Sequence, residues 1–417
     1  MAYMFKGKQS VGFRAQADLS TPAATGSSTD WIWPVCDAPD ITFGDAAEIS
    51  EMRLTNGAGV SPQPDVGSRD GGTFTVRGPL LGQLSTYDHT SDTPVVSPMA
   101  EILAWAIGST VTSAYDAGDV AAGSTTSTLN TTAGTYKIGT LVPYAASASA
   151  ALNGMGWSTT QATQAISLAD PAEQAGDSGD DTWPAVNAFI DYTSPTPKTG
   201  RIVGRNAEED LRLIGCMPTA WKIEPVSGVI YAEVDIVFTD HAWEGSGGLV
   251  SPLAYVKLPN IKTKANSADH TGARMLLDGA TACPLNDWSV SGTIDYAVLG
   301  PFGRQGVCSR IVTDREVMVE FTKPVDDGDI SSNELSWDDD YESNADLELS
   351  FFLGHTAGSV FSWYTPALQI VSRPQPVIIG KRLIGRRVSC KLARYIDDAI
   401  GDGAAGAINA GLRFALA

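Results

Sequence analysis

Residues 176–179 read Gly-Asp-Ser-Gly, a motif in which one class of serine proteases places its nucleophile. Attack by such a serine requires a histidine base beside it and an aspartate that orients the histidine. None of the 4 histidines lies in the Ala-Ala-His-Cys context that accompanies the motif; they are His89, His241, His270 and His355. We therefore predict no catalysis at Ser178, and no other motif in the sequence indicates an enzyme.

Two acidic runs, residues 326–329 (Asp-Asp-Gly-Asp) and residues 338–340 (Asp-Asp-Asp), offer the carboxylate oxygens that calcium prefers. An EF-hand loop needs acids at alternating positions, a central glycine and a distal glutamate in fixed register, and that register is absent. We interpret residues 326–348 as a solvated acidic loop, the alternative being an adventitious cation site. No P-loop and no Gly-x-Gly-x-x-Gly motif occurs, so the sequence predicts neither a metal nor a cofactor.

The cysteines do not form a metal-binding or disulfide pattern. There are 5 of them, with no Cys-x-x-Cys spacing, at Cys36, Cys216, Cys283, Cys308 and Cys390. A zinc knuckle or a disulfide framework would need closer and paired spacings. The sequence therefore predicts buried free thiols in a protein that is made in a reducing cytoplasm.

The charge balance limits the partners of the chain. Asp and Glu total 48 against 28 Lys and Arg, which gives a formal net charge of −20. Because each phosphate contact needs a basic side chain, broad nucleic-acid binding is disfavoured, and so is docking on an anionic membrane. No signal-peptide core and no run of about 18 apolar residues occurs, so we predict neither a leader nor a membrane helix.

Basic residues cluster at one place, and these are Lys381, Arg382, Arg386 and Arg387. A nucleic-acid patch is one interpretation, although four charges are few on so acidic a chain. A salt-bridging edge that meets an acidic neighbour is the interpretation that we prefer. Trp31 and Trp33 leave two alternatives open, a mobile arm that docks on a neighbour or a local core under a loop.

Alternating apolar residues predict that most of the chain forms β-strands. In residues 229–239, Ile230 and Val234 fall on one face, whereas Glu233 and Asp235 fall on the other. Residues 221–224 precede a turn at 226–228, so the two segments are predicted to form a hairpin. Further strands are predicted at 47–55, 72–78, 288–296, 315–322 and 346–353. A Gly- and Pro-rich loop is expected to join the first two of these.

Residues 98–107 are predicted to form a helix. Ser97 suits its N-cap, Pro98 its first turn and Gly108 its end. Its apolar residues form a helical stripe, so one side is expected to pack on a sheet. A second helix is predicted at 391–400.

The fold class is therefore mainly β, and we predict two tandem β-sandwich or small-barrel domains, each with a short packed helix. The first covers residues 1–250 and contains an Ala/Ser/Thr/Gly-rich insertion at 109–182, which we expect to form long surface loops, with weak strands within them as an open alternative. The second covers residues 251–417, with the acidic loop at 326–348 and a C-terminal extension. An ancient duplication is inferred from this pattern alone.

The order of these elements resembles the major tail tube proteins of long-tailed bacteriophages. Residues 213–221 (Leu-Ile-Gly-Cys-Met-Pro-Thr-Ala-Trp), with the hairpin that runs to Trp243, resemble the late strand pair of that family's tube domain. Residues 71–76 (Gly-Gly-Thr-Phe-Thr-Val), followed by the predicted helix up to Ser109, are similar to its strand–helix step. Residues 288–323 resemble a second tube domain.

This resemblance implies a structural virion protein that is not an enzyme and is assembled in the host cytoplasm. Two tube domains per chain imply homotrimeric, pseudo-hexameric rings that stack into a tail tube. Tape measure, terminator and distal tail proteins would be partners, and double-stranded DNA would pass through without specific binding. The alternatives are a capsid decoration or head-surface protein, and a carbohydrate-binding or carbohydrate-acting β-sandwich protein.

Acidic residues on the polar strand faces are the candidates for the lumen or for ring interfaces, where they would repel DNA phosphates. They are Glu233, Asp235, Asp295, Glu316 and Glu320. The alternative for each is an outward, solvated side chain. The basic cluster Lys381, Arg382, Arg386 and Arg387 is the candidate for contacts between subunits.

Overall fold

The structure is a computed structural model and describes most of the 417 residues. The described residues are 9–24, 26–43, 49–55, 60–66, 71–82, 97–112, 120–132, 139–146, 152–162, 165–169, 172, 174–183, 185–190, 194–204, 209–245, 261, 273–277, 280–281, 287–299, 307, 309–324, 340–354, 356, 358–379, 383–393 and 411–416.

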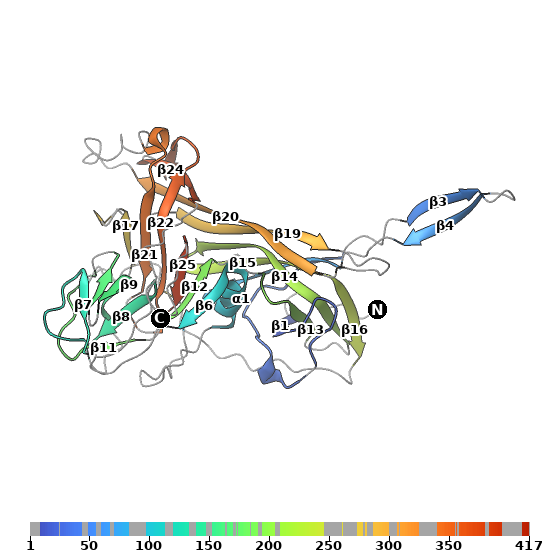
Figure 1. Cartoon of the computed structure of the whole chain (residues 1–417), viewed down its shortest axis with the longest axis horizontal. Helices are drawn as coiled ribbons and strands as arrows, with labels where there is room; N and C mark the ends of the chain where they lie inside the picture. The colour runs from blue at the N-terminus through green and yellow to red at the C-terminus, as the bar shows by residue number, and fades with distance from the viewer. Residues whose placement is uncertain are drawn as a thin grey trace.

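One long, continuous sheet dominates the molecule (Figure 1). Its strands follow one another, edge to edge, as β2 (Ile41–Phe43), β5 (Gly72–Pro79), β15 (Val229–Phe238), β14 (Glu209–Val226), β19 (Asp287–Leu299), β20 (Ser309–Pro324), β24 (Leu383–Leu392) and β23 (Gln375–Ile379). All of these pairings are antiparallel. The prediction of a mainly β fold is confirmed.

The predicted hairpin at 221–239 is confirmed as β14 and β15. Val226 lies opposite Val229, so Ser227 and Gly228 alone form the turn. Both have positive φ angles, 51° and 84°. A two-residue turn of this kind matches the right-handed twist of the two strands that it joins. The turn chemistry therefore sets the register of the hairpin.

Strand β14 is shared between two parts of the sheet. Its first half pairs with β13 (Lys198–Gly204) and β16 (Asp240–Gly245), and β13 pairs in turn with β1 (Gln9–Ala15). Its second half pairs with β15 and β19. The change occurs near Gly215, whose φ is +68° and where a Cβ would lie 2.6 Å from the carbonyl oxygen of Leu19. Only glycine suits this crossing.

A second group of strands continues from β24 around the core. β22 (Phe361–Ile370) pairs with β24, β21 (Leu347–Leu353) and β25 (Arg413–Leu416), and β25 pairs with β12 (Val186–Ile190). β12 also pairs with β6 (Gly108–Thr112). β17 (Ala273–Leu277) pairs with β21 and with β18 (Ala280–Thr281). Trp288, Phe361 and Phe414 are among the aromatic residues that fill the enclosed core.

The predicted helix is confirmed as α1 (Pro98–Ile107). Met99, Ile102 and Leu103 are buried in the same core as Val234 and Ile236, so the helix packs on the apolar side of the long sheet. Ser97 precedes it in an extended conformation but makes no side-chain capping hydrogen bond.

In the described part of residues 109–182 the structure has strands, which were the alternative to uninterrupted surface loops, and they are better ordered than expected. β7 (Thr128–Asn130), β8 (Leu141–Ala145), β9 (Leu152–Ala162), β10 (Ala165–Leu168) and β11 (Asp181–Thr182) form a separate five-stranded sheet. Figure 1 shows most of these strands together at the lower left. The few large apolar residues of the stretch gather into its own core, which includes Leu129, Val142, Tyr144, Ile166 and Leu168. Small residues elsewhere allow close strand packing, so low hydrophobicity did not mean absence of structure.

Three further predictions need correction. Between the predicted strands at 47–55 and 72–78 lies another strand, β4 (Val60–Val66), and it pairs with β3 (Ile49–Thr55). The predicted helix at 391–400 does not begin at 391, because Lys391 and Leu392 end strand β24, where they pair with β20 and β22; residues 394–400 lie outside the described residues. Residues 340–343 of the predicted acidic loop form a helical turn; residues 326–339 are also outside the described part.

The sheet and the core both continue across the predicted domain boundary near residue 250. β14 pairs directly with β19, and β12 with β25. The division into 1–250 and 251–417 remains a prediction.

Candidate functional site: a charged sheet face

The long sheet has one apolar face and one charged face. Along β15, Ile230, Ala232 and Val234 are buried, whereas Tyr231 and Glu233 are partly exposed. Directly opposite residues of antiparallel strands point to the same side. Register therefore places Arg77, Glu233, Lys222, Ser291, Met318 and Lys391 in one row across β5, β15, β14, β19, β20 and β24. This row belongs to the face that points away from the core.

The five predicted acids Glu233, Asp235, Asp295, Glu316 and Glu320 all lie on this face, as the same registers show. We use the name charged face for its ionisable residues, which are Arg77, Lys222, Glu224, Glu233, Asp235, Asp287, Asp295, Asp314, Glu316, Glu320, Arg387 and Lys391. Eight are carboxylates and four are basic, so the face carries a net negative charge. Whether these acids line a lumen remains a prediction.

Ion pairs hold the basic groups at the β5–β14 end of the face. The Arg77 guanidinium lies 3.3 Å from Glu224 and 3.3 Å from Glu233, and the Lys222 ammonium lies 2.5 Å from Glu224. The hydrogen bond from Lys222 is the largest of the influences that lower the pKa of Glu224. Asp235 accepts a hydrogen bond of 2.5 Å from Thr75.

The β20–β24 end of the face has two further ion pairs. Arg387 donates to Glu320 at 2.6 Å, and Lys391 lies 3.0 Å from Glu316. The hydrogen bond with Glu320 raises the pKa of Arg387. Asp295 lies directly opposite Asp314, and like charges in this position repel one another. Among the described residues, no basic group pairs with Asp295.

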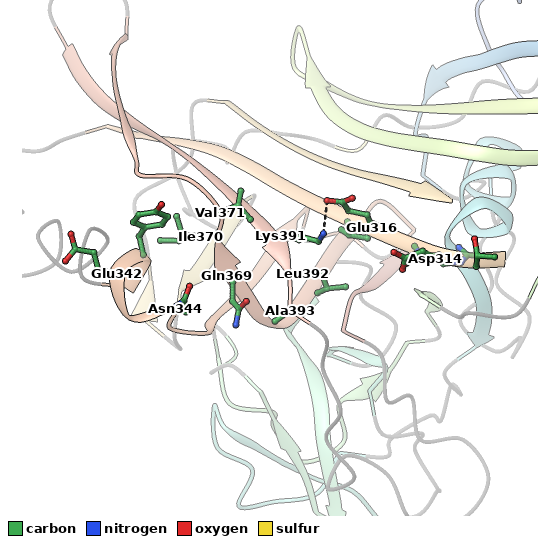
Figure 2. Close-up of a pocket in the computed structure, with 14 residues that line it drawn as sticks. Asp314, Glu316, Glu342, Asn344, Gln369, Ile370, Val371, Lys391, Leu392 and Ala393 are labelled. Carbon is green, nitrogen blue, oxygen red and sulfur yellow. Dashed lines mark hydrogen bonds and ion pairs between the residues drawn. The ribbon is translucent and has the colours of Figure 1, made fainter. Parts of the chain in front are cut away.

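A groove of about 960 Å³ lies at one end of the charged face. Asp314, Glu316 and Lys391 line one part of it, and Tyr341 and Glu342 line another. Figure 2 shows Lys391 turned toward Glu316, with Glu342 and Asn344 at the far end. No group of His, Cys, Asp or Glu in the described ranges is arranged to hold a metal ion. The groove offers carboxylate acceptors and a paired cation.

Only two of the four residues of the basic cluster are among the described residues. Arg386 and Arg387 lie on β24, where successive residues point to opposite sides. Arg387 pairs with Glu320 of its own chain, which is the salt-bridging alternative. Lys381 and Arg382 lie outside the described residues, and contacts of the cluster with other subunits remain a prediction.

The other candidate residues from the sequence lie outside the charged face. Ser178 is exposed on a turn, and His241 packs against Phe43, with ring centroids 4.7 Å apart. His89, His270 and His355 lie outside the described residues. Trp31 is buried, and the guanidinium of Arg201 lies 5.4 Å from its ring centroid, so the local-core alternative holds for Trp31.

Sequence reasoning missed three buried arginines, Arg201, Arg315 and Arg413. Arg201 forms an ion pair with Asp210, which is also fully buried. Arg315 donates to the carbonyl oxygens of Ala106 and Ile107 at the C-terminal end of α1, at 2.9 and 2.5 Å. A signal for Arg315 existed, because it shares the alternating register of Val317 and Val319 on the predicted strand.

The described cysteines Cys36, Cys216 and Cys390 are free thiols, and the last two are buried, as predicted. Burial raises the pKa of Cys216 and of Cys390 to about 12. We expect both to react with a thiol reagent at pH 8 far more slowly in the folded protein than in denaturant, since the thiolate is the reactive form. Mass spectrometry of the labelled sites measures this, with C216S and C390S as site controls.

The same shifts predict how stability changes with pH. A folded-state pKa above the unfolded value means that the folded protein retains protons that the unfolded chain loses. The stability contributed by the protonated thiols is therefore complete below about pH 9 and falls as the pH rises toward 12. Alkaline unfolding that is unchanged in a C216S/C390S double variant would contradict this.

Within the described residues, no helix is long and apolar enough to cross a membrane. No family model matches this sequence, and a search of curated proteins gave no match.

Proposed function

We propose that this chain is a structural subunit of a bacteriophage tail tube, forming stacked rings through which genomic DNA passes during ejection. The observation that carries the proposal is the continuous sheet with a core on one side and the charged face on the other. In this proposal the charged face lines the lumen. The chain is assembled in the host cytoplasm and ends in the virion.

The pairing of charges on this face suits passage of DNA. Each of its four basic residues, Arg77, Lys222, Arg387 and Lys391, already has a carboxylate partner within 3.3 Å. Phosphate binding would require a basic group to leave that partner, whereas the surplus carboxylates repel the phosphates. DNA beside such a surface is held away from the wall.

Strand edges that have no partner among the described strands support self-association. β23 pairs only with β24 among the described strands, and β3 and β4 pair only with each other. Exposed strand edges must be covered or protected, and an isolated two-stranded hairpin is marginally stable in water. We propose homotrimeric, pseudo-hexameric rings, with tape measure, terminator and distal tail proteins as further partners.

Negative-stain microscopy of the purified chain tests the proposal. Hollow rings or tubes with threefold or sixfold symmetry are the expected result. Compact particles without a pore that bind capsids would instead support the head-surface alternative. Turnover or binding of glycans, lost on substitution of acids in the groove, would support the carbohydrate alternative.

Neutralising three lumen acids is expected to slow genome ejection without preventing ring formation. The triple variant E233Q/E316Q/E320Q removes three negative charges and also leaves Lys391 and Arg387 without their carboxylate partners. DNA phosphates should then bind these bases, with a several-fold slower ejection that recovers as salt is raised. Fluorescence of DNA released from assembled particles measures the rate.

The matched control for this experiment is the triple variant D177N/E342Q/D346N. Its three carboxylates are exposed and lie outside the charged face, and the change in net charge is the same. Equal ejection rates for the two triple variants would contradict an electrostatic role of the face.

A further inference from the structure

Exposed apolar side chains gather at both ends of strand β20. At one end, Leu299 is 49% exposed and Ile311 is 48% exposed, on the two strands of the β19–β20 hairpin. At the other end, Ile378 is 77% exposed on the edge strand β23. Val298 is also exposed at the first of these ends, whereas the other exposed large apolar residues among those described, Phe43, Trp243 and Val371, lie elsewhere.

The first site, which we call the tip patch, consists of Leu299, Ile311 and the opposed pair Asp295 and Asp314. Asp295 and Leu299 lie on the same side of β19, because they are four residues apart on a strand. Ile311 lies opposite Ala297, and Ala297 lies between Asp295 and Leu299 on β19. The patch therefore combines exposed apolar surface with two carboxylates that repel each other.

The second site, which we call the hairpin patch, consists of Pro376, Ile378 and Arg386. Pro376 lies opposite Arg386, and Ile378 is two residues from Pro376 on the same strand, so the side chains of Pro376, Ile378 and Arg386 point to one side of the β23–β24 hairpin. This is also the side on which Val388 enters the core farther along β24. Ile378 therefore points like a core residue, but the described residues leave most of it uncovered.

The two patches of one chain cannot meet. β24 reaches β20 only along Met318–Pro324, and β23 pairs with the part of β24 opposite the end of that segment. About 13 strand residues separate Ile311 from Pro324, which is roughly 40 Å at about 3.3 Å per residue. Figure 1 shows β24 rising at the left of the molecule, while the β19–β20 hairpin runs toward the right.

We propose that the hairpin patch of one copy binds the tip patch of a second copy, in a head-to-tail contact along the direction of the strands. Ile378 would pack on Leu299 and Ile311, and Arg386 would approach the opposed carboxylates. The contact covers the Asp295–Asp314 end of the charged face, so the remainder of that face is the part that lines the lumen. Apolar surface thus meets apolar surface and opposite charges meet. The contact is heterologous, because different patches of the two copies are used, and repeating it stacks copies lengthwise.

This inference rests on the proposed self-assembly and names one of its contacts. The test uses two single variants, I378D in the hairpin patch and I311D in the tip patch, with V371D as the control. Val371 is 44% exposed and belongs to neither patch. All three wild-type side chains are substantially exposed, so each variant is expected to melt like the wild type.

Mass photometry then follows assembly of each protein. At a concentration where the wild type and V371D assemble fully, I378D and I311D are each expected to stop at the unit that forms without this contact. Mixing the two arrested variants in equal amounts should yield a species of twice the mass of that unit and nothing larger. I378D retains only its tip patch and I311D retains only its hairpin patch. One contact can therefore form between the two variants, and the resulting species has no further pair of intact patches with which to grow.

Unchanged assembly of I378D or of I311D overturns the inference, as does a mixture that fails to double in mass. A contact between two identical hairpin patches would also overturn it, by arresting I378D and sparing I311D. Microscopy of the same samples separates the two proposals. If both variants still assemble fully into hollow particles, the proposed contact is wrong and the tail tube function stands. If the wild type assembles into particles without a pore and both variants are arrested, the contact stands and the tail tube function is wrong.

Discussion

Replacing Asp210 with asparagine is expected to lower the free energy of unfolding by about 3–5 kcal/mol. Asp210 lies in β14 and forms an ion pair of 3.7 Å with Arg201 in β13, and neither side chain is more than 1% exposed. The variant keeps the size of the side chain but removes its charge. Arg201 would then hold an unbalanced charge inside the protein, where water cannot solvate it.

Chemical denaturation of D210N measures the loss, and E342Q is the control. Glu342 pairs with Arg373 on the surface, where both side chains are more than half exposed, so its substitution should cost less than about 1 kcal/mol. A double variant, D210N/R201M, should recover part of the stability, because it removes the unbalanced charge as well. A loss for D210N no larger than that for E342Q would contradict the prediction.

Replacing Arg315 with methionine is expected to destabilise the protein by about 2–4 kcal/mol. The Arg315 guanidinium donates to the carbonyl oxygens of Ala106 and Ile107, which end helix α1. Methionine keeps most of the volume of the side chain but offers no donor, so two buried acceptors would lose their partner. The positive charge that stabilises the helix C-terminus would also be lost.

Arg315 and α1 come from different sides of the predicted domain boundary, so R315M also tests how strongly the two parts depend on each other. Hydrogen exchange is expected to accelerate first in the last turn of α1. Lysine at this position should restore part of the stability, since one ammonium can reach one carbonyl. R387M serves as the control because Arg387 is about half exposed. Equal stabilities of R315M and R387M would exclude the capping role.

The regular strands and the helix could be predicted because their periodicity follows directly from burial on one side. The β14–β15 hairpin and α1 have both this periodicity and recognisable turn or end residues. The five-stranded sheet at 128–182 could not be predicted in the same way. Its core uses few large side chains, such as Leu129 and Tyr144, at spacings that only the tertiary fold brings together.

The candidate site was predictable in part for a similar reason. Alternation alone assigns Glu233 and Glu316 to polar strand faces, but it cannot show that two distant strands present the same face of one sheet. That depends on the pairing of β14 with β19, where Gly292 lies under the indole of Trp221. The ion pairs of Arg77 and Arg387 depend on the same long-range registers, so no local pattern contains them.

Strand β25 has a consequence for the order in which the chain can fold. Its residues lie between β12 and β22, with Phe189 opposite Arg413 and Tyr364 opposite Arg413 on the other side. The sheet therefore cannot close during synthesis until residues 413–416 have been made, and folding is expected to be slow, as it is for chains rich in distant contacts. If the chain assembles as proposed, subunits would remain incompetent to assemble for that interval, which would keep partly made chains out of growing tubes.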